Sequence, residues 1–154
     1  MRKYLTFSLG SEEYGIEIRD ITEIIGIQNI TDLPGVPNYV KGVINLRGKV
    51  IPVMDLRLRF MIEEKEYDER TCIIVVNVKG MAVGLIVDSV TEVLDISAKD
   101  IEPPPIVNQS GVSRYILGLG KAGDEVKIIL DTQELLFGEE LDLIAEAASA
   151  NAEA

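Results

Sequence analysis

The chain has 154 residues, 47 % of them hydrophobic, which is enough apolar material for one compact domain. Its 26 acidic residues outnumber its 15 basic residues and give a net charge of -11, which excludes the nucleic-acid backbone as a main partner. It has no histidine and one cysteine, so disulfides within the chain, His-based catalysis and ordinary zinc sites are excluded too. We predict a non-enzymatic protein with no catalytic residue, metal or cofactor.

No apolar run approaches the roughly 20 residues that a membrane-spanning helix needs. The first residues, MRKYLTF, also lack the long apolar segment of a signal peptide. We therefore expect a cytoplasmic protein that does not itself insert into a membrane. Cys72, inside the apolar run TCIIVVNV, is expected to act as a small core residue.

Short runs rich in Val, Ile, Tyr and Phe follow one another along the chain, separated by Gly, Pro and Asn. Their length and composition are typical of strands. In the first half they are KYLTFSL (3–9), EYGIEI (13–18), EIIGIQNI (23–30), KGVINL (41–46) and KVIPVMDL (49–56). In the second half they are TCIIVVNV (71–78), MAVGLIV (81–87), TEVLDIS (91–97), YILGLG (115–120) and EVKIIL (125–130). Ten strands in this space suggest barrels.

The two sets of strands are related by an internal repeat. A shift of 69 places KYLTFSLGSEEYGIEIRDITEIIGI on CIIVVNVKGMAVGLIVDSVTEVLDI, and a shift of 76 places VKGVINLRGKVIPVMD on ILGLGKAGDEVKIILD. Gly15 matches Gly84 in the first alignment, which extends to match Pro34 with Pro103, and Gly42 matches Gly118 in the second. The apolar phase agrees in both, which favours duplication over coincidence. We predict two five-stranded barrels that share a hydrophobic core, one from residues 3–60 and one from residues 71–136.

The sequence pattern at the end of the chain predicts a helix. Leu141, Ile144, Ala145 and Ala148 are spaced as one apolar helical face, which predicts a C-terminal helix over about 138–149 that docks on a barrel. Asp131 and Glu134 are spaced as a capping pair for a short helical turn before it.

Arg47 is the only charged residue between Gly42 and Gly48 in the most apolar hairpin, KGVINLRGKVIPVMDL. On the pattern alone it is an exposed turn residue, since a surface ion pair contributes only about 0–1 kcal/mol to folding. Its long side chain could also lie along an apolar surface and offer its guanidinium to a partner.

The segments YGIEIRDITEII, NLRG and VGLIVDSVTEVLDI resemble the chemotaxis coupling proteins of the CheW family, over about residues 3–145. The resemblance implies a single CheW-like domain over 1–154, made of two SH3-like β-barrels with short helices. It also implies a non-enzymatic adaptor that couples chemoreceptors to the histidine kinase CheA. Such an adaptor is recruited to the inner face of the membrane through receptor arrays.

The resemblance also assigns residues. The receptor-binding positions of the family, expected to hold the hairpin tip of the receptor, fall on Glu23, Arg47, Ile18, Ile21, Gly42, Val90 and Val93. Contacts to CheA are expected on the second half, at Cys72, Ile74, Val76, Val83 and Leu85.

The sequence leaves other interpretations open for these residues. The four Ile and Val positions of the receptor set alternate along strands, so they could be core. Gly42 could serve a bulge. Glu92 matches Glu23 in the repeat, but Gly123 occupies the position that matches Arg47. We therefore expect only one half to carry the receptor determinant.

A second function stays open at this stage. The two barrels could bind or convert a small ligand, with Arg47 and the acidic linker over residues 63–70 lining one pocket. This function predicts a cavity in which titratable groups converge.

Overall fold

The structure is a computed structural model that describes residues 2–104, 114–136 and 138–153. The described residues are mainly β, as predicted, with eleven strands rather than ten. In chain order the strands are β1 (Arg2–Leu9), β2 (Glu12–Glu17), β3 (Ile21–Gly26), β4 (Val40–Leu46), β5 (Lys49–Asp55), β6 (Cys72–Val78), β7 (Met81–Val87), β8 (Ser89–Ile96), β9 (Ile101–Glu102), β10 (Ile116–Ala122) and β11 (Glu125–Leu130).

Helices are few and mostly short. They are η1 (Ile18–Asp20), α1 (Leu56–Arg59), η2 (Ala98–Asp100), η4 (Thr132–Glu134) and the C-terminal α2 (Gly138–Glu153). Asp55 caps α1 by accepting from the amide of Arg57, and Asp131 caps η4 by accepting from the amide of Gln133. The C-terminal helix begins where the apolar pattern placed it and ends at Glu153 rather than near residue 149.

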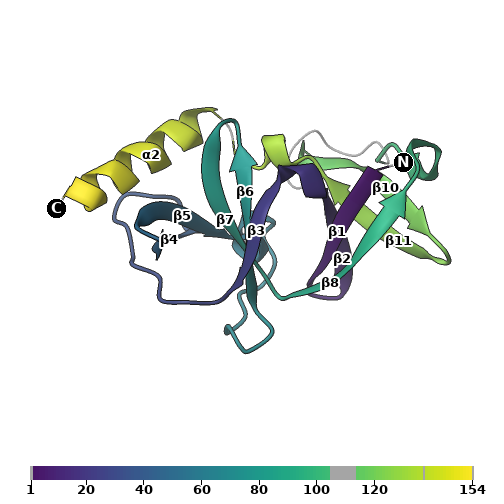
Figure 1. Ribbon diagram of the computed structural model, residues 1–154, viewed down its shortest axis with the longest axis horizontal. Helices are drawn as coiled ribbons and strands as arrows, with labels where there is room; N and C mark the ends of the chain where they lie inside the picture. The colour runs from purple at the N-terminus through teal and green to yellow at the C-terminus, as the bar shows by residue number, and fades with distance from the viewer. Residues whose placement is uncertain (1, 105–113, 137, 154) are drawn as a thin grey trace.

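The strands form two sheets that lie next to each other (Figure 1). Sheet A has six strands in the order β8-β1-β2-β11-β10-β9, and sheet B has five in the order β3-β6-β7-β5-β4. The described strands therefore build open sheets of six and five strands rather than two closed five-stranded barrels.

The halves of the sequence exchange strands between the sheets. β1 and β2, from the first half, pair with β8 and β11 of the second half in sheet A. β6 and β7, from the second half, pair with β3 and β5 of the first half in sheet B. Each sheet thus contains strands of both halves, and the boundaries 3–60 and 71–136 mark repeats in the sequence rather than separate barrels.

The internal duplication is confirmed by the strand register. β5 and β7 run parallel with Val53 opposite Gly84, and the same repeat positions meet between β11 and β2, where Ile129 lies opposite Gly15. The irregular pairings repeat as well: the bulge between Val40 and Gly42 recurs between Ile116 and Gly118, and the bulge between Ile21 and Glu23 recurs beside Val90 and Glu92. Such agreement between two pairs of strands is what duplication requires.

One central core joins the two sheets, as predicted. Phe7 and Ile16 of sheet A pack in the same cluster as Ile74 and Leu85 of sheet B. α2 covers one end of sheet B with Leu141 and Ile144, both part of that cluster (Figure 1). A second cluster, which includes Ile44, Ile51 and Ile73, lies on the other face of sheet B.

Candidate functional site

Arg47 lies at the tip of the β4–β5 hairpin. Leu46 pairs with Lys49, so Arg47 and Gly48 form a two-residue turn, and both have positive φ angles, 52° and 86°. This is the type I′ geometry that matches the twist of a hairpin. The side chain of Asn45 accepts a hydrogen bond from the amide of Gly48 at 2.8 Å and closes the turn.

The guanidinium of Arg47 donates to the carboxylate of Glu23 on β3. This hydrogen bond raises the pKa of Arg47, which stays fully charged. The Arg47 side chain is 71 % exposed whereas that of Glu23 is only 24 % exposed. The other carboxylate oxygen of Glu23, Oε1, is buried and accepts no hydrogen bond from the described residues. The pair therefore presents a charged donor beside a buried acceptor.

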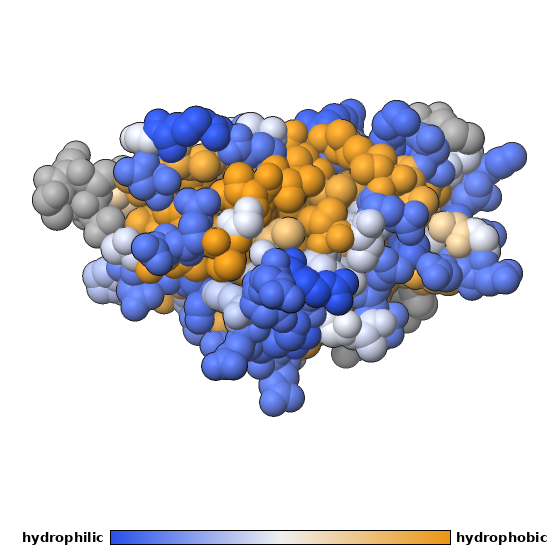
Figure 2. Space-filling view, turned by 60° about the horizontal axis from the view of Figure 1, so that its bottom comes forward, coloured by the Kyte–Doolittle hydropathy of each residue, from blue (hydrophilic) through white to orange (hydrophobic). Residues whose placement is uncertain are grey.

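Apolar side chains of η1, β3 and β8 lie partly or largely exposed at the surface, and β3 also carries Glu23. Ile18, Ile21 and Val90 are half-buried and pack on the central core, and Val93 is 53 % exposed. β3 and β8 are the outer strands of sheets B and A, and both lie at the front of the molecule in Figure 1. Figure 2, in which the lower side has come forward, shows a broad band of hydrophobic side chains across this face.

Ile24 belongs to the same surface and was missed by the sequence interpretation. It is 44 % exposed, one of the few large apolar side chains with that much free surface. The repeat could have found it, since Ile24 matches Val93 and Ile21 matches Val90. We name the surface formed by Ile18, Ile21, Ile24, Val90 and Val93 the β3–β8 face.

Gly42 serves the backbone rather than a contact surface. It is buried, lies at the bulge of β4 and has a φ of 146°. A methyl group there would overlap the carbonyl oxygen of Thr31, whose backbone bridges to Val43 at 2.8 Å. Its repeat partner Gly118 meets the backbone of Glu102 in the same way, with a distance of 2.7 Å to a Cβ.

The positions predicted to contact the kinase lie on β6 and β7. These are interior strands of sheet B, with a neighbour on each side. Four of the five side chains are at most 1 % exposed and form the central core: Ile74, Val76, Val83 and Leu85. Close packing in the core keeps these four from reaching a partner, and only Cys72 has partly exposed surface.

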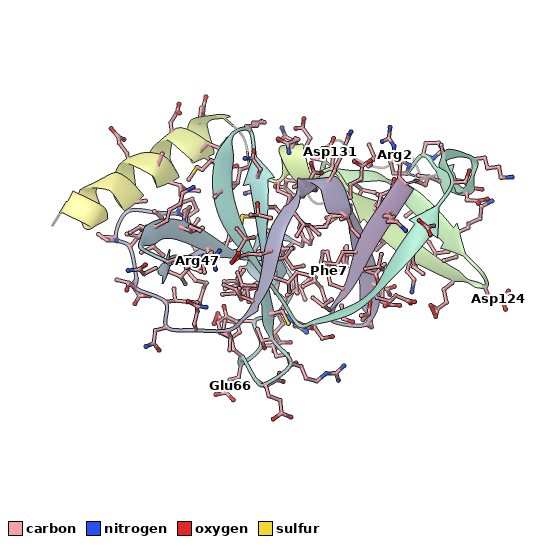
Figure 3. All side chains as sticks on the ribbon, viewed as in Figure 1. Arg2, Phe7, Arg47, Glu66, Asp124 and Asp131 are labelled. Atoms are coloured by element: carbon pink, nitrogen blue, oxygen red, sulfur yellow. The ribbon has the colours of Figure 1, made fainter. Side chains whose placement is uncertain are left out.

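The second half carries no equivalent of the charged pair. Gly123, which takes the place of Arg47 in the repeat, has a φ of 65° at the tip of the β10–β11 hairpin. Figure 3 shows the neighbouring Asp124 at one end of the molecule and Arg47 in the other half, with sheet B. Glu92 is exposed, and its amide donates to the hydroxyl of Thr6 at 3.2 Å. Of the two repeat-related hairpin tips, β4–β5 and β10–β11, only the first therefore has a cation at this position.

The acidic linker lies away from Arg47. Glu66 projects at the bottom of the molecule in Figure 3, and the linker residues Lys65 and Glu66 line a small cavity with Asp55, Arg57 and Asp88. In that region Arg57 binds Asp88 through two hydrogen bonds of 2.7 and 2.6 Å, and Tyr67 donates to Asp55 at 2.7 Å. These contacts tie the linker to the sheets and do not bring its carboxylates to Arg47, which Figure 3 labels apart from Glu66.

Two further properties bear on the kind of site this is. In the parts of the chain that the structure describes, no group of three or more Asp, Glu or Cys side chains is arranged to hold a metal ion. Among those same parts, no helix is long and apolar enough to cross a bilayer.

Comparison with known proteins shows which family the chain is similar to. A family model described as a CheW-like domain matches residues 3–140. Chemotaxis protein CheW of Klebsiella aerogenes is 39 % identical over 150 residues, which is 97 % of this chain and 90 % of that protein. Chemotaxis protein CheW of Helicobacter pylori is 37 % identical over 134 residues, covering 87 % of this chain and 81 % of that protein.

A solved structure extends the likeness to three dimensions. The crystal structure of the scaffolding protein TtCheW from Thermoanaerobacter tengcongensis matches with a TM-score of 0.83 at 39 % identity, covering 90 % of this chain and 94 % of that chain. The family model and these relatives cover most of the chain, so the protein belongs to the CheW family of chemotaxis scaffolding proteins.

Proposed function

We propose that this chain is a non-enzymatic adaptor that couples transmembrane chemoreceptors to the histidine kinase CheA. In this role it works in the cytoplasm and reaches the inner face of the membrane through receptor arrays. The observation that carries the proposal is the β3–β8 face with the Glu23–Arg47 pair at its side. An exposed apolar surface on an otherwise strongly acidic protein is expected to be covered by a partner.

The chemistry of this face suits the helical hairpin tip of a receptor. Ile24 and Val93 offer exposed apolar surface from the outer strands of two sheets, which fits a helix lying between them with apolar residues at spacings of three and four. Arg47 keeps donors free of Glu23, because only one of its nitrogens is engaged by that carboxylate. Glu23 Oε1 supplies an acceptor for a polar group of the receptor. These polar groups fix the register of an otherwise apolar contact.

The test is to titrate the purified protein against a receptor cytoplasmic fragment and, separately, against the regulatory domain of CheA. Arg47→Glu is expected to weaken receptor binding by more than tenfold, about 1.4 kcal/mol, and to leave kinase binding unchanged. Lys49→Glu is the matched control, since it makes the same charge change two residues away on the exposed start of β5.

Circular dichroism of each variant checks that the fold is retained. If the wild type binds neither partner, the coupling function is refuted. If Arg47→Glu and Lys49→Glu weaken receptor binding equally, the contact depends on overall charge and not on the Glu23–Arg47 pair.

A further inference from the structure

We propose that Asn45 is a positioning residue for Arg47, and through it for the receptor contact. This inference rests on the proposed function for its role in binding, but its geometric part stands by itself. It starts from the backbone of Arg47, one of three non-glycine residues with positive φ among those that the structure describes. A left-handed conformation is strained for an ordinary L-residue, so something must compensate for it.

The internal repeat shows that the fold does not require a side chain at this position. The residue that replaces Arg47 in the second half is Gly123, with a φ of 65°, and the hairpin there closes without a cation. Glycine adopts this conformation at little steric cost. Arg47 is therefore retained at a conformational cost that its counterpart avoids.

A second hairpin of sheet B repeats the same arrangement. In the turn between β6 and β7, Lys79 has a φ of 50° and is followed by Gly80 with a φ of 88°. The side chain of Asn77 accepts a hydrogen bond from the amide of Gly80 at 2.8 Å, as Asn45 does from Gly48. The residue that replaces Lys79 in the repeat is again a glycine, Gly10, with a φ of 64°.

In both turns that have a cation in the left-handed conformation, an asparagine lies two residues before it. In the two matching turns that have glycine at that position, the asparagine is absent. Ser8 stands where Asn77 would be, and Lys121 stands where Asn45 would be. The side-chain carbonyl of the asparagine accepts a hydrogen bond from the amide of the residue after the cation, which stabilises the turn. The cations of the two turns make different contacts.

Lys79 is turned towards the body of the protein. Its Nζ donates to the carbonyl of Leu136 at 3.2 Å, and its amide donates to the side chain of Gln133 at 2.7 Å. Arg47 instead extends to Glu23 and stays 71 % exposed. Asn77 therefore supports a contact within the fold, and Asn45 supports the residue that faces a partner.

A double-mutant cycle tests this assignment. Asn45→Ala is expected to raise the Kd for the receptor fragment about threefold or more, and Asn45→Asp, which keeps an acceptor oxygen, is expected to restore it to within about twofold. In an Arg47→Ala background, Asn45→Ala should leave the Kd unchanged, because the residue through which it acts is gone. Asn77→Ala is the matched control and should leave the Kd for the receptor unchanged.

A spectroscopic readout separates this inference from the proposed function. In Asn45→Ala, the NMR resonance of the Arg47 side-chain Nε–H should move and the Gly48 amide should exchange faster with solvent, whereas Asn77→Ala should change neither. If the Arg47 resonance and the Gly48 exchange rate stay as in the wild type, Asn45 does not position Arg47. If they change but the wild type does not bind the receptor, the positioning stands and the proposed function fails. An additive loss of affinity in the double variant would also overturn the inference.

Discussion

At Gly42 the neighbouring backbone leaves no room for a side chain. The closest atoms to a Cβ built at this position belong to the Thr31 carbonyl, so alanine requires the backbone to move. We predict that Gly42→Ala lowers the free energy of unfolding by about 3 kcal/mol or more, measured by urea denaturation.

Gly35→Ala is the control for backbone conformation alone. Gly35 has a φ of 76° but no atom within 4 Å of a Cβ, so its substitution should cost only the conformational term of about 1–2 kcal/mol. Equal losses for the two variants would mean that the close approach to Thr31 contributes nothing to stability.

Lys127 is charged, whereas the residue that matches it in the repeat is apolar. Its side chain is 2 % exposed and donates to Glu13 and to Glu125, whereas the equivalent Ile51 belongs to the apolar cluster of sheet B. The hydrogen bond from Lys127 holds the pKa of Glu13 below its ordinary value of 4.5. Because the folded state binds this proton less readily than the unfolded chain, Glu13 stabilises the fold above pH 4.5 and loses that contribution as the pH falls further.

We therefore predict that Lys127→Met flattens the dependence of stability on pH below about pH 5, measured by urea unfolding at a series of pH values. Lys121→Met is the comparison, because Lys121 pairs with Glu102 at the surface, where the two side chains are 53 % and 62 % exposed. A slope in Lys127→Met as steep as in the wild type would show that Glu13 does not owe its low pKa to Lys127.

At the scale of elements, the C-terminal helix is fixed by a buried arginine between two repeat-related tyrosines. The guanidinium of Arg59 lies 4.2 Å from the ring centre of Tyr39 and 4.8 Å from that of Tyr115. It binds Glu140 of α2 through two hydrogen bonds of 2.7 and 2.9 Å. The hydroxyl of Tyr39 donates to the same carboxylate. This cluster holds the start of α2 against the sheets.

We predict that Glu140→Ala lowers the free energy of unfolding by about 2–4 kcal/mol, because it removes the carboxylate from an arginine whose side chain is only 6 % exposed. Hydrogen exchange along α2 should become faster in the same variant. Glu139→Ala, at the exposed neighbouring position, should change stability by less than about 0.5 kcal/mol. Unchanged exchange in Glu140→Ala would show that the apolar contacts of Leu141 and Ile144 suffice to hold the helix.

Most elements could be predicted from the sequence, but their pairing could not. Alternating apolar residues and turn glycines identify strands such as β1 and β6, and the repeat relates them. A strand buries the same side chains whether it pairs within its own half or with its repeat partner in the other half. The pattern therefore cannot distinguish separate barrels from exchanged ones. The pattern also did not show that Ile74 and Leu85 would be core while Ile24 would be surface, because it does not say which strands lie inside a sheet and which at its edge.

At the scale of the whole molecule, strand exchange makes the two halves depend on each other. The first half alone would leave β3 and β5 without β6 and β7 between them, and the second half alone would leave β8 and β11 without β1 and β2. Each fragment would expose the central core, which draws buried side chains from both halves. A protein of two independent barrels would behave differently, since each half would keep its own core.

We therefore predict that fragments 1–66 and 67–154, divided in the exposed linker, lack tertiary structure alone and recover it when mixed in equal amounts. The cut leaves every strand intact, so lost structure would reflect missing partners rather than a broken element. NMR dispersion and near-UV circular dichroism of each fragment and of the mixture measure this, with the intact chain as reference. A fragment that folds by itself as a monomer would contradict the exchanged pairing. Recovery on mixing would show that the connection between the halves is dispensable once both halves are present, because the contacts between β2 and β11 and between β5 and β7 hold them together.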